Sequence, residues 1–263
     1  MLRKKALLGT ITAALALLAA TAALAATING TAASETLVGT PQNDTINGLA
    51  GDDQIIGLGG NDTINGGDDD DTIKGDDICP AGRTGAPYYC IPGNDGNDRI
   101  AGGRGQDTIN GNGRNDRIDG GSGGDELRGD AGNDRIDGGS GTDILSGAGG
   151  SDRMNGGSSS DRVSGGGGDD RLTGATGSDL VFGGNGKDRM IGSNGNDRLS
   201  GGNGNDRIEG NRGKDVIRAG AGNDRIAVRD GRRDTVNCGR GGDRVTADRR
   251  DRIARNCERV SRR

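Results

Sequence analysis

A nine-residue period that links three residue types dominates this sequence. Asp stands at every ninth position through two runs, 44–71 and 98–224, and three looser copies follow the second run. An apolar residue stands two positions after each Asp, and Gly stands five positions before it from Gly39 to Gly210. A short period that keeps its phase this long indicates a solenoid, in which each repeat packs on its neighbours.

The repeated unit is G-G-x-G-x-D-x-U-x, where U is apolar, and it has a direct physical interpretation. Gly permits positive φ and close backbone approach, so the first six positions predict a turn. The D-x-U-x segment predicts a short strand that points U inward, between outward neighbours. One strand with one buried apolar side chain is unstable alone, so successive units must stack. The sequence therefore predicts an all-β fold.

Composition excludes several classes of function. The chain has 56 Gly, 29% hydrophobic and 1% aromatic residues, a composition that without the repeat would indicate disorder. It has no His, which excludes a Ser-His-Asp triad and a His-ligated zinc site. Its formal net charge of −5 provides no basic excess, so nucleic acid is not an expected partner.

The unit resembles the RTX, or haemolysin-type, calcium-binding nonapeptide repeat, over about residues 39–251. The segment Gly102-Gly103-Arg104-Gly105-Gln106-Asp107 fits the motif fully. The resemblance implies a calcium-binding parallel β-roll, a β-solenoid with two repeats in each coil, two sheets, and turns at two edges. It also implies that sixth-position Asp side chains and turn carbonyls bind several Ca²⁺ ions between adjacent coils.

The predicted metal ligands share the sixth position of the unit. Stacking would place these carboxylates above one another, and a hard cation that takes six to eight oxygen ligands would remove their repulsion. The alternative is that the Asp residues only favour turns. If the carboxylates do bind calcium, calcium binding should be coupled to folding. The predicted ligands are Asp44, Asp53, Asp62, Asp71, Asp98, Asp107, Asp116, Asp125, Asp134, Asp143, Asp152, Asp161, Asp170, Asp179, Asp188, Asp197, Asp206, Asp215 and Asp224.

Residues 1–25 predict a secretory signal peptide. A basic start precedes an uncharged apolar stretch that ends Ala23-Leu24-Ala25, an A-x-A cleavage signal. The alternative is an uncleaved membrane anchor. Cleavage predicts a secreted, extracellular protein without stable membrane insertion.

Four cysteines in an exported chain suggest two disulfides, with Cys79–Cys90 and Cys238–Cys257 as the simplest pairing. A four-thiolate zinc site is the alternative. The first pair closes an insertion at 76–92 within the repeats at 26–226. The second would staple a cap at 227–263, a basic segment with 12 Arg and six acidic residues, net +6, against −14 for residues 26–226.

The position after Asp carries Arg at 99, 117, 135, 153, 171, 189, 207 and 225, every 18 residues. With two repeats in a coil, this spacing predicts a row of Arg on one sheet. The row either solubilises the sheet or binds an anionic polymer.

The predicted function is a secreted calcium-binding repeat protein, structural or associated with the cell surface or matrix. No non-repeat stretch exceeds about 40 residues, well short of a domain, so an enzyme is not expected. The alternatives are a module that binds anionic surface polysaccharide, or an accessory part of an extracellular hydrolase. Ice binding would need a flat, regular outward Thr row, whereas outward Thr occurs only at positions 45, 63, 72, 108 and 235.

Overall fold

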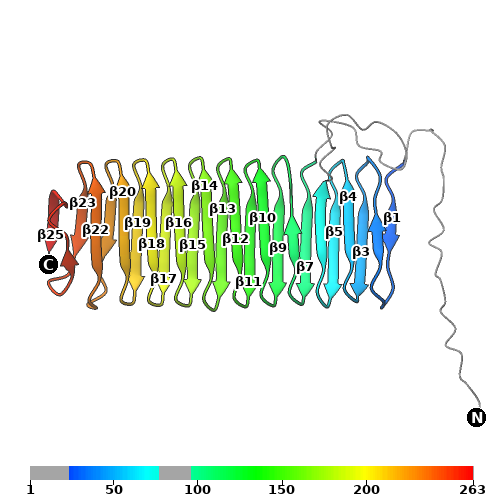
Figure 1. Ribbon diagram of the computed structural model, residues 1–263, viewed down its shortest axis with the longest axis horizontal. Coiled ribbons are helices and arrows are strands. Elements are labelled where there is room, and N and C mark those ends of the chain that lie inside the picture. The colour runs from blue at the N-terminus through cyan, green and yellow to red at the C-terminus, as the bar shows by residue number, and fades with distance from the viewer. Residues whose placement is uncertain (1–23, 77–95, 263) are drawn as a thin grey trace, which may run out of the picture.

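The chain forms a long rod of stacked strands (Figure 1), described here from a computed structural model for residues 24–76 and 96–262. Within these two ranges the strands form one 13-stranded and one 12-stranded sheet, and no helix occurs. Odd-numbered strands lie in the first sheet and even-numbered strands in the second. The chain therefore crosses from one sheet to the other after every strand.

The 13-stranded sheet contains β1 (Thr27–Asn29), β3 (Thr45–Ala50), β5 (Thr63–Asp68), β7 (Arg99–Arg104), β9 (Arg117–Ser122), β11 (Arg135–Ser140), β13 (Arg153–Ser158), β15 (Arg171–Thr176), β17 (Arg189–Asn194), β19 (Arg207–Arg212), β21 (Arg225–Val228), β23 (Arg244–Ala247) and β25 (Arg259–Arg262). The 12-stranded sheet contains β2 (Thr36–Val38), β4 (Gln54–Leu58), β6 (Thr72–Asp76), β8 (Thr108–Asn110), β10 (Glu126–Ala131), β12 (Ile144–Gly149), β14 (Arg162–Gly167), β16 (Leu180–Asn185), β18 (Arg198–Asn203), β20 (Val216–Ala221), β22 (Thr235–Arg240) and β24 (Arg252–Ile253).

All strand pairs are parallel and keep the sequence period. In the pair β11–β13, Arg135 lies opposite Arg153 and Ile136 opposite Met154. Equivalent residues of adjacent coils are 18 positions apart, as for Asp134 and Asp152. Two nonapeptides therefore make one coil, which confirms the predicted parallel β-roll.

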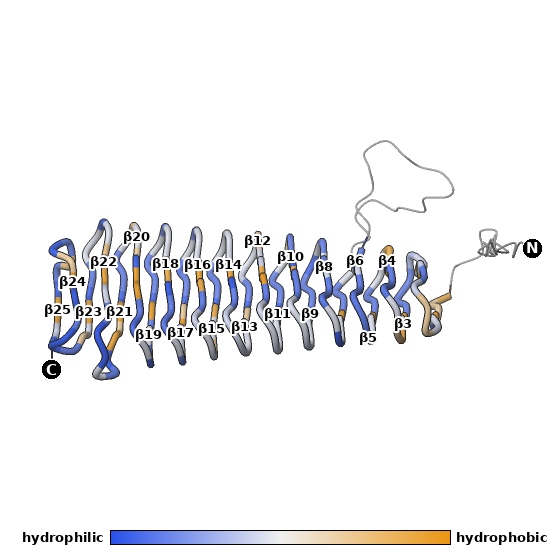
Figure 2. Tube along the Cα trace, turned by 60° about the horizontal axis from the view of Figure 1, so that its bottom comes forward, coloured by the Kyte–Doolittle hydropathy of each residue, from blue (hydrophilic) through white to orange (hydrophobic). Residues whose placement is uncertain are grey.

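The interior is filled by one apolar side chain from each nonapeptide. These residues, from Ile46 to Val245, are at most 2% exposed. Figure 2 shows the apolar positions recurring from coil to coil along the rod. Because each coil contributes only two such side chains and no aromatic ring, little apolar area is buried per residue, so the fold needs a further source of stability.

The strands are longer and the turns shorter than the sequence predicts. A typical strand such as β13 continues through the first three positions of the next unit, so the expected six-residue turn was wrong. Gly157 adopts φ 109° and still pairs with Gly139, because glycine adopts positive φ without strain. The turn proper needs a second glycine: Gly141 has φ 129°, and a Cβ there would overlap the carbonyl oxygen of Gly123.

The insertion leaves the stack of coils intact. Strand β5 pairs directly with β7, with Thr63 opposite Arg99, so the two sides of the insertion lie in consecutive coils. The backbone N–H of Asp62 correspondingly donates to Asp98 across 36 residues instead of 18. The insertion adds the length of two nonapeptides, which explains why the phase survives it. The predicted Cys79–Cys90 pair and most of the signal peptide lie outside the described residues.

An N-terminal coil precedes the predicted series. Strands β1 and β2 place Ile28 and Leu37 against the core, and Glu35 takes the position of the repeat Asp. The signal was present in the sequence, because Gly30 stands five residues before Glu35 and Leu37 two residues after it.

Within the described residues, no helix is long and apolar enough to span a bilayer.

The C-terminal coils differ from the rest in what fills the interior. The inward glycine is replaced by larger buried residues, Ala219, Val228, Cys238 and Ala247. Cys238 and Cys257 form a disulfide with 5.2 Å between their Cα atoms, which confirms this predicted pair and excludes a four-thiolate zinc site. Strands β22–β25 continue both sheets beyond residue 227.

Candidate metal centre

The predicted metal ligands form two straight rows, one at each edge of the rod. The first Asp column precedes the strands of the 13-stranded sheet, and the second precedes those of the 12-stranded sheet. All are at most 3% exposed. The first column contains Asp44, Asp62, Asp98, Asp116, Asp134, Asp152, Asp170, Asp188, Asp206 and Asp224. The second contains Asp53, Asp71, Asp107, Asp125, Asp143, Asp161, Asp179, Asp197 and Asp215.

One carboxylate oxygen of each Asp ties adjacent coils together. The backbone N–H of Asp152 donates to Oδ1 of Asp170 at 2.8 Å, and that of Asp161 donates to Oδ1 of Asp179 at 2.9 Å. The same bond recurs along both columns and continues beyond the predicted series. At one end, the backbone N–H of Glu35 donates to Oδ1 of Asp53. At the other end, the backbone N–H of Asp243 donates to Oε2 of Glu258.

The second carboxylate oxygen is buried and lacks a protein hydrogen-bond partner along most of both columns. A buried carboxylate oxygen without a partner costs several kcal/mol, because it has lost its hydration. Among the described residues this holds for Oδ2 of Asp53, Asp62, Asp71, Asp107, Asp125, Asp134, Asp143, Asp152, Asp161, Asp170, Asp179, Asp188, Asp197, Asp206, Asp215 and Asp224. Such a row of buried carboxylate oxygens fits the binding of cations.

The inward glycines allow the backbone to approach these oxygens closely. A Cβ built on Gly156 would lie 2.6 Å from Oδ2 of Asp161 and 2.8 Å from the carbonyl oxygen of Gly174 in the next coil. The glycine backbone, one carboxylate oxygen and one backbone carbonyl oxygen therefore meet with no room for a side chain, at a position here called the glycine-lined site. Calcium binds oxygen ligands at about 2.3–2.6 Å, and mixed sets of carboxylate and carbonyl oxygens are usual for it.

The coils near the insertion and near the C-terminus depart from this glycine pattern. At Asp98, Gly75 occupies the inward position, whereas Gly93, five residues before this Asp, lies outside the described residues. At Asp224 the inward position belongs to Ala219. The glycine-lined site therefore occurs only in the coils up to Asp215.

The donor set fits calcium. Within the described ranges, no group of three or more His, Cys, Asp or Glu side chains could hold an ion by itself. An ion bound along a column would therefore have to combine carboxylate oxygens with backbone carbonyl oxygens. A hard cation with flexible geometry accepts this arrangement, whereas zinc or copper would require nitrogen or thiolate ligands.

Burial raises the pKa values of the column aspartates when no metal is bound. Desolvation raises the pKa of Asp62 to about 8 and those of Asp107 and Asp161 to about 7, partly offset by backbone hydrogen bonds. Neighbouring carboxylates of the same column raise these pKa values further. Without a metal, the folded state therefore favours protonated aspartates.

This shift gives a pH dependence with a definite sign. The folded pKa values exceed the ordinary Asp value, so the metal-free fold loses stability as pH rises from about 4 through about 8. In calcium-free buffer, we expect lowering the pH from about 8 to about 5 to increase the β signal in circular dichroism. In a calcium titration, the same change should raise the midpoint, because protons compete for the carboxylates. A pH-independent spectrum and midpoint would contradict these assignments.

A second ladder, which the sequence analysis did not predict, uses the fifth position of the unit. The backbone N–H of Asn115 donates to the side-chain oxygen of Asn97 in the preceding coil at 2.9 Å. Asn133 and Ser151 repeat this bond in the following coils. The signal was the recurrence of Asn, Ser and Asp directly before the repeat Asp. These residues hold the turns in register on the outside of the columns.

Third-position side chains lie outside the columns. Asn185 and Asn203 are exposed, and their amides hydrogen-bond each other at 2.9 Å. Asp68, also exposed, lies 3.7 Å from the guanidinium of Arg104. These side chains point away from the glycine-lined site.

Comparison with known proteins agrees with this geometry. The sequence profile of the family described as RTX calcium-binding nonapeptide repeat (4 copies) matches residues 29–64, 50–77, 92–127, 119–154, 155–190, 191–226 and 200–233. No curated protein matches the chain significantly.

One similar solved structure is a hyperactive, Ca²⁺-dependent, β-helical antifreeze protein from an Antarctic bacterium. It is 19% identical, with a TM-score of 0.53, over 82% of this chain and 83% of that one, which supports the fold alone. The family matches cover most of the chain, and the family binds multiple Ca²⁺ ions through its repeats. The chain belongs to the RTX calcium-binding nonapeptide repeat family and is a calcium-binding structural repeat protein.

Proposed function

We propose that this protein is secreted, folds when calcium fills the two Asp columns, and serves outside the cell as a surface- or matrix-associated rod. The observation that carries the proposal is the row of buried Oδ2 atoms along both columns, most of them next to an inward glycine. The thin apolar interior supplies little stability, so calcium binding to the folded state becomes the main folding energy. Calcium is typically more abundant outside cells than inside, which would make export the folding signal.

The ligands of this proposal are the nineteen predicted aspartates, with turn carbonyls completing each shell. Glu35 adds a carboxylate at the N-terminal end, where its Oε2 accepts the N–H of Thr31 at 2.8 Å. The role of the coils is binding and scaffolding rather than catalysis. RTX repeat coils are generally non-catalytic, and the described residues consist of such coils.

The antifreeze activity of the structural neighbour is not carried over to this chain. The outward row on the 13-stranded sheet begins with Thr27, Thr45 and Thr63, but it continues with arginine from Arg99 onward. A flat, regular Thr array is therefore confined to three strands. The arginines instead favour an anionic polymer, such as a surface polysaccharide, as the partner.

Export is tested by the N-terminus of the mature protein. Expression of the full chain in a secreting bacterial host should give an extracellular species that begins at Ala26, as read by mass spectrometry. Ala25→Arg should block cleavage and retain the chain in the membrane fraction, whereas Leu24→Gln, at the variable position of the signal, should be cleaved normally. A parent chain that keeps Met1 in the membrane fraction would show that residues 1–25 act as an anchor.

A further inference from the structure

A continuous row of arginines follows the outer surface of the 13-stranded sheet. Neighbours in the row are register partners, as for Arg153 and Arg171, and all of them are exposed. Strand spacing places successive members about 4.8 Å apart. The row, here called the Arg ladder, contains Arg99, Arg117, Arg135, Arg153, Arg171, Arg189, Arg207, Arg225, Arg244 and Arg259.

The charge of the ladder is largely left uncompensated by the protein. Among the described residues, only Arg189 and Arg207 of the ladder form ion pairs, and both pair with Glu209, at 3.6 Å and 2.9 Å. The nearest acids in the adjacent outward row are Asp119 and Asp137, toward the N-terminal side. Between Asp137 and Glu209 the adjacent row holds only uncharged residues.

A groove runs along the middle of the ladder, and Asp137 and Ile191 are among the residues that line it. Its volume is about 550 Å³, and Arg135, Arg153, Arg171 and Arg189 form one side. Asn155 and Thr173 lie beside them in the adjacent row. The groove thus combines guanidinium groups, which bind carboxylates in a bidentate manner, with amide and hydroxyl groups that bind neutral oxygen atoms.

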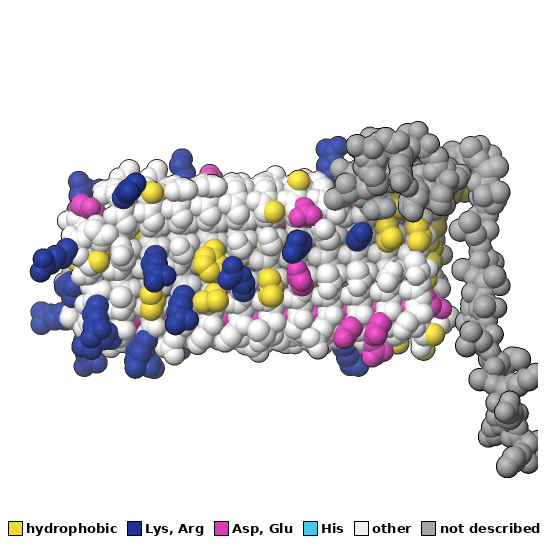
Figure 3. All heavy atoms as spheres, viewed as in Figure 1, with side chains coloured by type: hydrophobic (Ala, Val, Ile, Leu, Met, Phe, Trp, Pro, Cys, Tyr) yellow, Lys and Arg dark blue, Asp and Glu magenta, His cyan; other side chains and the backbone are white. Residues whose placement is uncertain are grey.

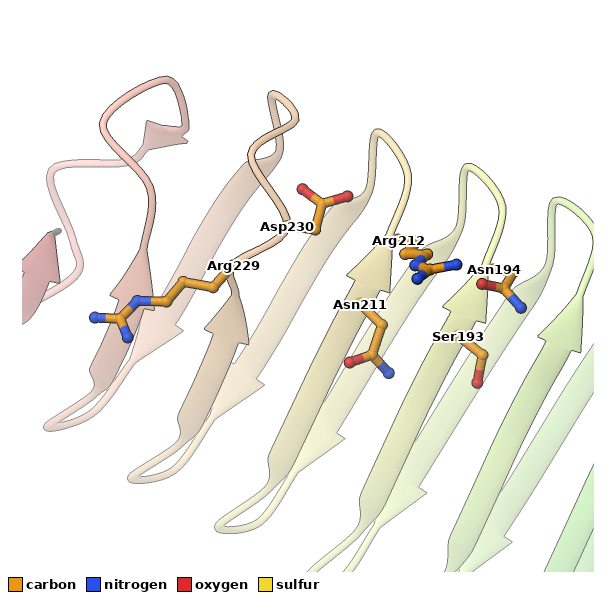
Figure 4. A pocket seen from close by; sticks show the side chains of 6 residues that line it. All are labelled: Ser193, Asn194, Asn211, Arg212, Arg229 and Asp230. Atoms are coloured by element: carbon orange, nitrogen blue, oxygen red, sulfur yellow. The ribbon is translucent and has the colours of Figure 1, made fainter.

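Polar groups continue along the same sheet toward its C-terminal coils. Further along β17 and β19, a hollow of about 410 Å³ is lined by Ser193, Asn194, Asn211, Arg212, Arg229 and Asp230. Figure 4 shows these side chains on neighbouring coils. In Figure 3, basic side chains gather at the end of the rod that carries β25, whereas acidic side chains gather near β3 and β5. On this face, basic and acidic side chains are therefore concentrated toward opposite ends of the rod.

We infer that the Arg ladder and its groove bind a linear anionic polysaccharide whose sugars carry carboxylates. The inference rests on the proposed function, because calcium-dependent folding aligns the arginines. A linear polymer suits a straight ladder with one cation per coil, and the amide and hydroxyl groups suit sugar hydroxyls. Single-stranded nucleic acid is less suited, because the described part of this sheet has no aromatic side chain on which a base could stack.

The test uses the calcium-loaded mature protein and short oligogalacturonates that do not form calcium gels. Binding is measured by calorimetry at rising sodium chloride, with neutral dextran and single-stranded DNA as further probes. The test variant carries Arg135→Gln, Arg153→Gln, Arg171→Gln and Arg189→Gln. The matched control carries the same number of changes on the 12-stranded sheet: Arg162→Gln, Arg198→Gln, Arg218→Gln and Arg252→Gln.

We expect the test variant to lose affinity about tenfold or more, and the control variant to bind within about threefold of the parent. Binding should weaken with salt, and dextran should not bind. Both variants should keep the β spectrum and calcium midpoint of the parent. Absence of binding by a folded parent, or equal losses in both variants, would overturn the inference while leaving calcium-dependent folding intact. Equal or tighter binding of single-stranded DNA would overturn the choice of polysaccharide.

Discussion

In calcium-free buffer at neutral pH, the mature chain is expected to give the circular dichroism spectrum of a coil, and in millimolar calcium that of a β protein. Without metal, neighbouring buried carboxylates within each column repel one another, and the apolar interior is too thin to offset this repulsion. Each site held at 100 times its dissociation constant adds about 2.7 kcal/mol to the folded state. Many such sites convert a marginal chain into a stable rod.

Magnesium provides the control for this experiment. It requires a smaller octahedral shell and dehydrates reluctantly, so it should leave the chain largely unfolded at the same concentration. Restored β structure on adding back calcium would show that chelation is reversible. The same β spectrum with and without chelator would mean that the columns are stable without metal, against the proposal.

The second large effect is expected from adding a methyl group at one of the inward glycines. Gly156→Ala places a methyl group where Oδ2 of Asp161 and the carbonyl oxygen of Gly174 converge. Overpacking of this kind costs about 1–3 kcal/mol, and the lost calcium site adds to it. We expect fewer bound calcium ions in equilibrium dialysis, a higher calcium midpoint and a lower melting temperature.

Gly149→Ala is the matched control, because it also changes a strand glycine of a central coil. A Cβ there has its nearest neighbour, the carbonyl oxygen of Asp130, at an ordinary 3.8 Å. This variant should bind as much calcium as the parent and melt within a few degrees of it. Equal calcium binding by Gly156→Ala and the parent would exclude the glycine-lined site beside Asp161 as a metal site.

The nine-residue period was sufficient to predict stacked strands and the core, whereas the two-unit coil and the Arg ladder also needed the resemblance to the RTX repeat. An inward residue in every unit, such as Met154 or Leu172, allows only one side of each strand to face the interior. Two units per coil then place Arg153 beside Arg171. The repeats keep their phase across the insertion because the insertion adds the length of two whole units. The sequence therefore indicated an interruption of one repeat array rather than a boundary between two domains.

Other features depend on contacts between coils and could not be read along the chain. The two oxygens of each carboxylate differ in their contacts: Oδ1 accepts a backbone N–H and Oδ2 has no protein hydrogen-bond partner. This difference arises only when coils stack, as Asp152 does on Asp170. Gly75 lies beside Asp98 because the fold closes over the insertion. The N-terminal coil was missed because Glu35 replaces Asp, although its flanking Gly30 and Leu37 keep the period.

The most direct test of the account is a crystal structure of the calcium-loaded protein, with anomalous diffraction measured at a wavelength where calcium scatters anomalously. The account predicts a row of anomalous peaks at each edge of the rod, repeating with the coils, each next to Oδ2 of a column aspartate such as Asp161. Peaks confined to exposed side chains such as Asp68, or no peaks beside the buried Oδ2 atoms, would contradict it.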